Sequence, residues 1–321
     1  MFLYLLNFNM SNYREFPAES QSNLKQILVH PLLYKNRDNK STKSLNMGSL
    51  VDCLLLTPED FDSTYFINDK ENPSDTVKSI WDEIYISYKT VPVLDFDIEI
   101  LNICKKMKYR AKQSDIVKLK YIHSFSHYFH FLKNSEGKII VSNKDYQKAC
   151  ELTNKLNEDP IINKLLFNLP KHKTNVFQEE IYWDKDGINL KSLLDVITID
   201  KKNKIIQPWD LKTTGFSVSS FKNSLWKFRY DFQASFYSEA LRFKYPDYVI
   251  LPFRFIVVST AFNDRPRIFE CSGRILDVGE NGDENYKGWK EALELLKFYS
   301  KNEIWNDTKE HIEGGDIVQL M

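Results

Sequence analysis

The chain has 321 residues, of which 42% are hydrophobic and 14% aromatic, and its formal net charge is zero. This composition excludes an intrinsically disordered chain and predicts a folded protein with a large apolar core. The balanced charge gives no indication of a nucleic-acid partner, so any such partner would have to bind a local basic surface.

The four cysteines are isolated in the sequence, and no CxxC pair is present. This spacing excludes a zinc ribbon and a clustered iron–sulfur centre, and it indicates buried thiols in a reducing compartment. The apolar run at residues 1–9 lacks a basic flank and is too short to span a bilayer, and a start of translation at Met10 would remove it. We therefore expect a soluble cytoplasmic protein without membrane association.

The first half of the chain is expected to be helical. Ser20 or Ser22 opens a short helix over residues 20–34, which Pro31 interrupts. Residues 75–165 are predicted to be mostly helical, with a turn at 134–137.

A buried helix is predicted around residues 47–55, because its apolar residues recur at i, i+3, i+4, i+7 and i+8. It should end before Pro58. Asp52 lies at the edge of the apolar stripe, one turn from Gly48. Because a glycine inside a helix costs about 1 kcal/mol relative to alanine, Gly48 suggests that another group approaches closely here.

Two features of the helical half have alternative interpretations. The segment Lys105–Lys120 has seven basic residues and one acid, and it is either a solvated helix face or a phosphate-binding surface. His123, His127 and His130 have the spacing of one helix face. We expect them to pack among the surrounding aromatic residues, with metal ligation as the alternative.

The second half alternates strand and helix patterns. Three successive strands are predicted, with an Asp-Gly hairpin turn after the first of them. Two helices, two further strands and a closing amphipathic helix should follow. The predicted strands are 177–183, 189–199, 204–212, 248–260 and 267–271, and the predicted helices are 217–227, 230–244 and 285–301.

Two aspartates and a lysine form the most informative pattern. Asp195 lies within the apolar run Leu193–Ile197, and Asp210 and Lys212 close the next predicted strand. Because a buried carboxylate needs a partner, and neighbouring strands bring the two aspartates side by side, we expect all three side chains to converge.

Such a cluster suits phosphodiester hydrolysis. Carboxylates would hold Mg²⁺ or Mn²⁺, the metal would activate water, and Lys212 would stabilise the transition state. The alternative is a buried Asp–Lys ion pair with a separately satisfied second aspartate.

Four sequence blocks, in order between residue 20 and about residue 245, together resemble the PD-(D/E)XK nuclease superfamily, in particular the phage-type exonucleases related to exodeoxyribonuclease VIII. The blocks are Ser22–Lys25 with His30–Tyr34, Gly48–Phe61, Lys191–Asp195 with Asp210–Thr214, and Tyr230–Tyr237 with its Gln-x-x-x-Tyr signature.

The resemblance implies roles for the matching residues. Asp195, Asp210 and the Leu211 carbonyl would bind metal, and Lys212 would be catalytic. Gln233 and Tyr237 would line the site and touch DNA, with helix packing as the alternative.

The sequence departs from the relatives at two points. Relatives often have a metal-binding histidine where Asp52 stands, so Asp52 is a candidate ligand in its place. They also often have a glycine and an arginine in the stretch occupied by residues 192–194. Another basic residue would then grip DNA, and the candidates are Lys191, Lys222, Lys227 and Arg229.

We therefore predict an α/β fold, with a mixed central sheet flanked by helices as in restriction endonucleases and a helical N-terminal part. A single nuclease domain is expected at residues 20–305, divided into a mainly helical part (20–165) and a catalytic part (166–305). An N-terminal extension (1–19) and a polar tail (306–321) would flank it.

The resemblance implies an exonuclease for linear double-stranded DNA in phage recombination or repair. It would be an oligomer in the host cytoplasm, with a single-strand annealing protein as partner. A structure-specific endonuclease and a catalytically inactive DNA-end-binding module are the alternatives.

Overall fold

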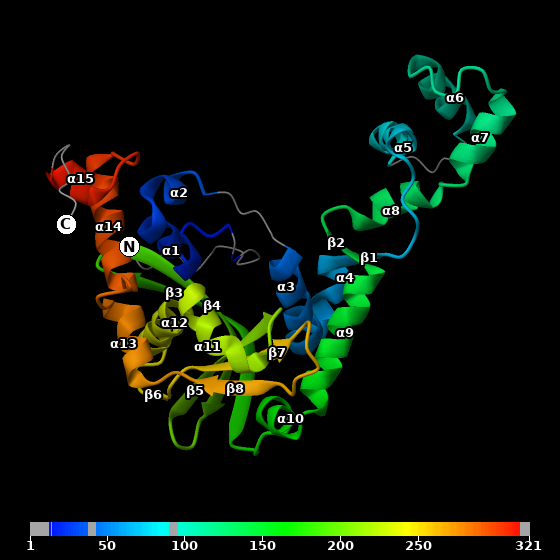
Figure 1. Ribbon diagram of the computed structural model, residues 1–321. Helices are drawn as coiled ribbons and strands as arrows, with labels where there is room; N and C mark the ends of the chain where they lie inside the picture. Colours follow the sequence, from blue (N-terminus) through cyan, green and yellow to red (C-terminus); the bar gives the residue numbers. More distant parts are fainter. Residues whose placement is uncertain (1–12, 14, 38–42, 90–95, 315–321) are drawn as a thin grey trace. The chain divides into compact units, whose positions relative to one another are not determined.

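The computed structural model describes residues 13, 15–37, 43–89 and 96–314 (Figure 1). The chain divides into two compact units, which we call the sheet unit (residues 1–56 and 151–321) and the helical unit (residues 57–150). The expected boundary at residue 165 is therefore a change of secondary structure inside the sheet unit. The candidate start at Met10 lies outside the described residues.

The sheet unit contains a mixed sheet of six strands, as the sequence predicted for its fold class. The order is β3-β4-β5-β7-β8, and β6 pairs with β5. Pairing is antiparallel throughout, except that β5 runs parallel to β6 and β7. The strands are β3 (Lys173–Lys185), β4 (Ile188–Asp200), β5 (Ile205–Thr214), β6 (Val249–Ile250), β7 (Arg254–Ser259) and β8 (Arg267–Glu270).

The first three predicted strands are confirmed, and the hairpin between β3 and β4 turns at Asp186-Gly187 as expected. Both turn residues have positive φ, at 53° and 80°, which a two-residue hairpin of this kind requires. The single strand predicted at 248–260 is wrong. It is divided into β6 and β7 around Pro252, which has no amide hydrogen for a ladder.

The sheet unit also contains nine helices in its described residues, and they lie on both sides of the sheet. They are α1 (Gln21–Val29), α2 (Pro31–Lys35), α3 (Lys43–Leu56), α10 (Pro160–Leu166), α11 (Phe221–Lys227), α12 (Tyr230–Lys244), α13 (Gly273–Asn281), α14 (Trp289–Asn302) and α15 (Lys309–Gly314), with the 3-10 turn η3 (Val218–Ser220). Helix α12 has the predicted bounds, and the side chain of Ser20 caps α1 by accepting from the Asn23 amide. The short helices α13 and α15 were not predicted, and α14 begins later than expected.

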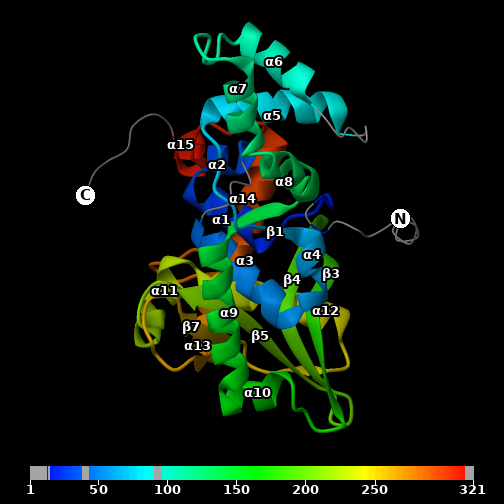
Figure 2. The same cartoon turned by 90° about the vertical axis from the view of Figure 1, so that its right-hand side faces the viewer.

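Side-chain alternation along β5 places α12 and α3 on opposite faces. Asp210 accepts a hydrogen bond from Gln233 of α12, whereas a Cβ built on Gly48 of α3 would lie 3.5 Å from Thr213 Oγ1. Figure 1 shows the strands between these two helices, and the turned view in Figure 2 brings α3 forward. The main core packs under α12 and includes Phe232, Phe236, Phe253, Phe255 and Trp289.

The helical unit has its own core around Trp81, which is 1% exposed. It also contains a parallel pair of short strands, β1 and β2, which the sequence did not predict. Its elements are η2 (Pro58–Asp60), α4 (Phe61–Thr64), β1 (Tyr65–Asn68), α5 (Asp75–Tyr88), α6 (Asp97–Lys106), α7 (Asp115–His123), α8 (His127–Ser135) and β2 (Ile139–Ser142). The boundary between the units falls within α9 (Asn143–Glu158).

The three histidines of this unit do not form one helix face, because α7 ends at His123 and α8 begins at His127. His123 Nε2 lies 2.6 Å from Asp97 Oδ1, and His127 Nε2 lies 3.0 Å from the Glu71 carbonyl. His123 also packs against Trp81, with ring centroids 6.2 Å apart. These contacts agree with the packing interpretation. Across the described residues, no helix is long and apolar enough to cross a membrane.

Candidate active site

Asp195 lies at the point where β4 stops pairing with β5. The register of β4 with β5 ends at the pair Val196–Trp209, one step before Asp195 and Asp210 would meet. Beyond this pair the Leu211 amide donates to Asp195 Oδ2 at 2.8 Å instead of to a backbone carbonyl. A carboxylate therefore takes the place of main chain in the ladder, which brings the two aspartates together as predicted.

The strand on the other side of Asp195, β3, also has an irregular backbone at this point. Phe177 and Glu179 of β3 pair with Val196 and Leu194, so Gln178 falls opposite Asp195, and its φ is 50°. The left-handed region is unfavourable for a residue with a side chain, and such strain concentrates at functional sites. The Gln178 side chain hydrogen-bonds Asp195 and favours its charged form.

Asp210 is 2% exposed and is held from two sides. Its Oδ1 accepts a hydrogen bond from Gln233 Nε2 at 2.6 Å, and its Oδ2 lies 2.5 Å from Lys212 Nζ. Asp210 and Lys212 thus share one face of β5, as their spacing predicted. Gln233 contacts the site through Asp210.

The Lys212 ammonium lies over an aromatic ring. Its Nζ is 5.0 Å from the centroid of Tyr230, which stacks on Phe221 at 5.7 Å. Burial alone would lower the pKa of Lys212, but the carboxylates of Asp210 and Asp195 outweigh it, so the pKa is raised. Lys212 is therefore a permanently charged ammonium, suited to neutralising negative charge.

Lys25 of α1 is a second basic residue near this centre, and no role was predicted for it from the sequence. Its Nζ donates to the Phe228 carbonyl at 3.2 Å and lies 5.7 Å from the Phe232 ring centroid. Burial and the neighbouring Lys212 lower its pKa to about 7. No local pattern marks this residue, because a lysine on an amphipathic helix is ordinarily solvated.

The carboxylates repel one another. Burial, followed by the charge of Asp210, raises the pKa of Asp195 from 3.8 to about 7. Burial and the charge of Asp195 raise the pKa of Asp52 as well. Asp52 of α3 therefore lies within electrostatic reach of Asp195, Asp210 and Lys212, although it is far from them in sequence.

Asp52 Oδ1 is buried and accepts no hydrogen bond from any described residue. A buried carboxylate oxygen without a partner beside two further carboxylates is the donor set of a hard divalent cation. These residues fit such an ion by chemistry and charge. Within the described ranges, however, no three His, Cys, Asp or Glu side chains already form a group that could hold a metal.

Tyr237 lies one helical turn from Gln233 but does not face solvent. It is 7% exposed, and the Gln21 side chain hydrogen-bonds it. Burial, followed by the neighbouring Tyr13, raises the pKa of Tyr237 far above 10. Contact of Gln233 and Tyr237 with DNA stays a prediction, and their packing roles are visible in the structure.

Four basic residues were predicted as substitutes for the relatives' arginine. Two of them already contact other groups of the protein. Lys191 Nζ donates to the carbonyls of Tyr13 and Phe16 at 2.9 and 2.8 Å. Arg229 pairs with the fully buried Asp231 at 2.9 Å. Lys222 and Lys227, on α11, are exposed.

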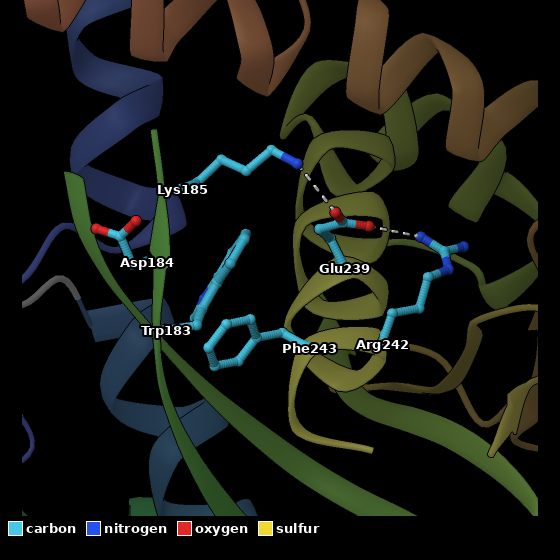
Figure 3. Close-up of a pocket in the computed structure, with 6 residues that line it drawn as sticks. All are labelled: Trp183, Asp184, Lys185, Glu239, Arg242 and Phe243. Carbon is cyan, nitrogen blue, oxygen red and sulfur yellow. Dashed lines mark hydrogen bonds and ion pairs between the residues drawn. The ribbon is translucent and has the colours of Figure 1, made fainter. Parts of the chain in front are cut away.

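None of the predicted site residues lines the pocket of Figure 3. That pocket encloses about 250 Å³ and lies between the β3–β4 turn and the end of α12. Its polar side chains satisfy one another, because Glu239 pairs with Lys185 at 3.3 Å and with Arg242 at 3.1 Å. The figure shows both ion pairs beside Trp183 and Phe243.

Two strands that bring Asp195, Asp210 and Lys212 together within a mixed sheet, backed by a helix carrying Gln233, define a protein of the PD-(D/E)XK class. Comparison with protein-family models agrees with this architecture. Residues 20–313 match the family described as PDDEXK-like domain of unknown function, DUF3799, and the chain belongs to that family. Nucleases of PD-(D/E)XK type typically depend on a divalent metal ion.

Among solved structures, the chain is similar to a protein from Eubacterium rectale named a "putative exonuclease". The two share 12% sequence identity with a TM-score of 0.43, over 95% of this chain and 90% of the other. A search of curated proteins finds no match.

Proposed function

We propose that this protein is a Mg²⁺- or Mn²⁺-dependent deoxyribonuclease that degrades linear double-stranded DNA from its ends. The observation that carries the proposal is the convergence of Asp195, Asp210 and Lys212 beside the unpartnered carboxylate oxygen of Asp52. A structural ion pair between Asp210 and Lys212 would not require two further carboxylates with raised pKa beside it.

Asp195, Asp210 and Asp52 would hold the metal, with the Leu211 carbonyl as a further ligand. The bound metal would supply Lewis acidity and lower the pKa of an attacking water. The Leu211 amide and Gln178 keep Asp195 oriented, and Gln233 keeps Asp210 oriented. Lys212 would neutralise the charge that builds up on the phosphate in the transition state.

Purified protein should be incubated with linear and with covalently closed circular duplex DNA, with Mg²⁺ or with excess chelator. We expect digestion of the linear form alone, and only with metal. Nicking of circles would identify an endonuclease instead. Binding without cleavage at any metal concentration would support the alternative of an inactive end-binding module, and cleavage in chelator would exclude the carboxylate mechanism.

A further inference from the structure

Two loops leave the sheet side by side just beyond Lys212. We call residues 215–217, after β5, and residues 260–266, after β7, the strand-end loops. Parallel pairing of β5 with β7 runs up to Thr214 and Ser259. The loops then stay joined, because the Thr260 amide donates to the Thr214 carbonyl at 2.8 Å. Ser217 Oγ donates to Asp264 Oδ2 at 2.7 Å.

Each strand-end loop presents a phenylalanine to solvent. Phe216 is 60% exposed and Phe262 is 52% exposed. Neither loop is loosely held, since Ser259 Oγ accepts from the Phe262 amide at 2.9 Å and Asp264 Oδ2 accepts from the Val218 amide at 2.8 Å. Two large apolar side chains are thus exposed to solvent on a backbone that hydrogen bonds fix in place. Such a feature indicates an interaction surface.

Cations surround these rings. Lys155 donates to Asn263 Oδ1 at 3.1 Å, the exposed Arg265 follows in the same loop, and the exposed Arg267 begins β8. The hydrogen bonds from Ser217 and Val218, assisted by the nearby Lys155 and Arg267, lower the pKa of Asp264, so this carboxylate is charged and already engaged. Asp159 pairs with Arg265 at 2.6 Å, yet Arg265 remains 61% exposed at its side chain.

A groove continues from the second loop. Arg265, Pro266 and Arg267 line a cavity of about 450 Å³, together with Asp159, Ile161, Ile162 and Ile268. Exposed aromatic rings followed by a groove with positive side chains are typical of surfaces that bind single-stranded nucleic acid. Bases stack on the rings there, and the cations follow the phosphates.

The surface is also close to the candidate active site. Phe216 follows Lys212 by four residues, which corresponds to about 13 Å of extended chain. A DNA strand bound at Lys212 would therefore extend only a short distance further to reach the rings of Phe216 and Phe262. Inside duplex DNA the base faces are covered by neighbouring base pairs, whereas an unpaired strand exposes the faces of successive bases to Phe216 and Phe262.

We propose that the strand-end loops bind unpaired DNA adjoining the cleavage site, with bases stacked on Phe216 and Phe262 and phosphates on Lys155, Arg265 and Arg267. The inference rests on the proposed nuclease function and adds its substrate class, a duplex end with an unpaired strand.

Binding should be measured in chelator by fluorescence anisotropy, with a labelled oligothymidine and with a blunt duplex of two complementary strands as probes. Phe216→Ala and Phe262→Ala should each weaken oligothymidine binding about tenfold, because stacking on an aromatic ring contributes about 1–3 kcal/mol per base. Duplex affinity should change little. Phe243→Ala, which removes a ring of 47% exposure from α12, serves as the matched control and should leave both affinities unchanged.

Phe262→Trp should retain oligothymidine affinity and show quenching of the new indole when the probe binds. Unchanged oligothymidine affinity in both alanine variants, or an equal loss in Phe243→Ala, would overturn the inference. Because the assay involves no cleavage, it is independent of the test of nuclease activity. If the protein binds oligothymidine through the two phenylalanines but cleaves no DNA, only the proposed function is refuted. If it cleaves DNA but the alanine variants bind oligothymidine normally, only this inference is refuted.

Discussion

Asp195 Oδ2 accepts the hydrogen bond of the Leu211 amide at 2.8 Å, at the point where the pairing of β4 with β5 ends. One main-chain bond of the ladder is thus replaced by a side-chain bond. The strands can separate there without leaving the Leu211 amide unsatisfied. Asp52 of α3 lies within electrostatic reach of this point, and Gln233 and Lys212 contact Asp210 there.

Replacement of Asp195 by asparagine should stabilise the metal-free protein in a pH-dependent way. The pKa of Asp195 in the native state is about 7, whereas an aspartate in the unfolded chain has a pKa of 3.8. Between these values the native state binds a proton that the unfolded chain has lost, so stability falls as pH rises through this window. The increase in Tm of Asp195→Asn over the wild type, in chelator, should be larger at about pH 8 than at about pH 5.

Calorimetry at both pH values measures this difference directly. Added Mg²⁺ at the higher pH should raise the Tm of the wild type more than that of Asp195→Asn, because a ligand stabilises only the state that binds it. Equal increments at the two pH values would mean that Asp195 carries no unfavourable charge.

Lys212→Ala should abolish turnover while DNA affinity changes little. The ammonium is fixed between Asp210 and the Tyr230 ring, so its loss removes stabilisation that is specific to the transition state. We expect kcat to fall by about a hundredfold or more, the range seen when one preorganised stabilising group is removed. Lys202→Ala, which removes an exposed lysine from the turn between β4 and β5, is the matched control.

Single-turnover cleavage and filter binding separate the two effects. Melting curves should accompany them, because Asp210 loses its ion-pair partner in this variant. A folded Lys212→Ala protein with normal kcat would move the catalytic centre elsewhere.

Charge reversal in the basic segment tests the phosphate-binding interpretation. Lys105, Lys108 and Lys112 are exposed, whereas Lys106 pairs with Glu83 at 3.0 Å and Arg110 lies 3.7 Å from the Tyr121 ring centroid. If the segment contacts DNA, a triple variant with Lys105, Lys108 and Lys112 replaced by glutamate should weaken binding on every sequence. It should also flatten the dependence of affinity on salt, by about 0.9 in slope per lost contact. A salt slope equal to that of the wild type would identify a solvated helix face.

Much of the site was predictable because its signals are local. Alternation along a strand fixes Asp210 and Lys212 on one face, and the short turn between β4 and β5 fixes the neighbourhood of Asp195. Helix α12 was predicted to the residue, since a proline and polar residues bound its apolar pattern.

The remaining features depend on contacts between distant segments. Glutamine has no preference for the left-handed region, so no local sequence pattern predicts the strained backbone of Gln178. His123 finds its partner Asp97 on a preceding helix, and the parallel pairing of β1 with β2 joins segments separated by several helices. The exposure of Phe216 and Phe262 likewise follows from where β5 and β7 end, which composition does not reveal.

The last prediction is that Asp52 contributes to metal binding. Its Oδ1 is buried without a hydrogen bond from any described residue, and its pKa is raised by burial and by the charge of Asp195. A cation would satisfy both conditions. Asp52→Ala should therefore weaken Mg²⁺ affinity, so that activity falls at low metal and partly recovers at high metal.

Asp52→His should retain more activity than Asp52→Ala, particularly with Mn²⁺, which accepts imidazole more readily than Mg²⁺ does. Asp52→Asn keeps the size of the side chain and separates loss of charge from loss of packing against β5. Isothermal titration of metal into each protein gives affinity independently of cleavage. Superimposable Mg²⁺ titrations of the wild type and Asp52→Ala would confine the ligands to β4 and β5, and would leave the Asp52 carboxyl as a buried group that is protonated rather than bound to metal.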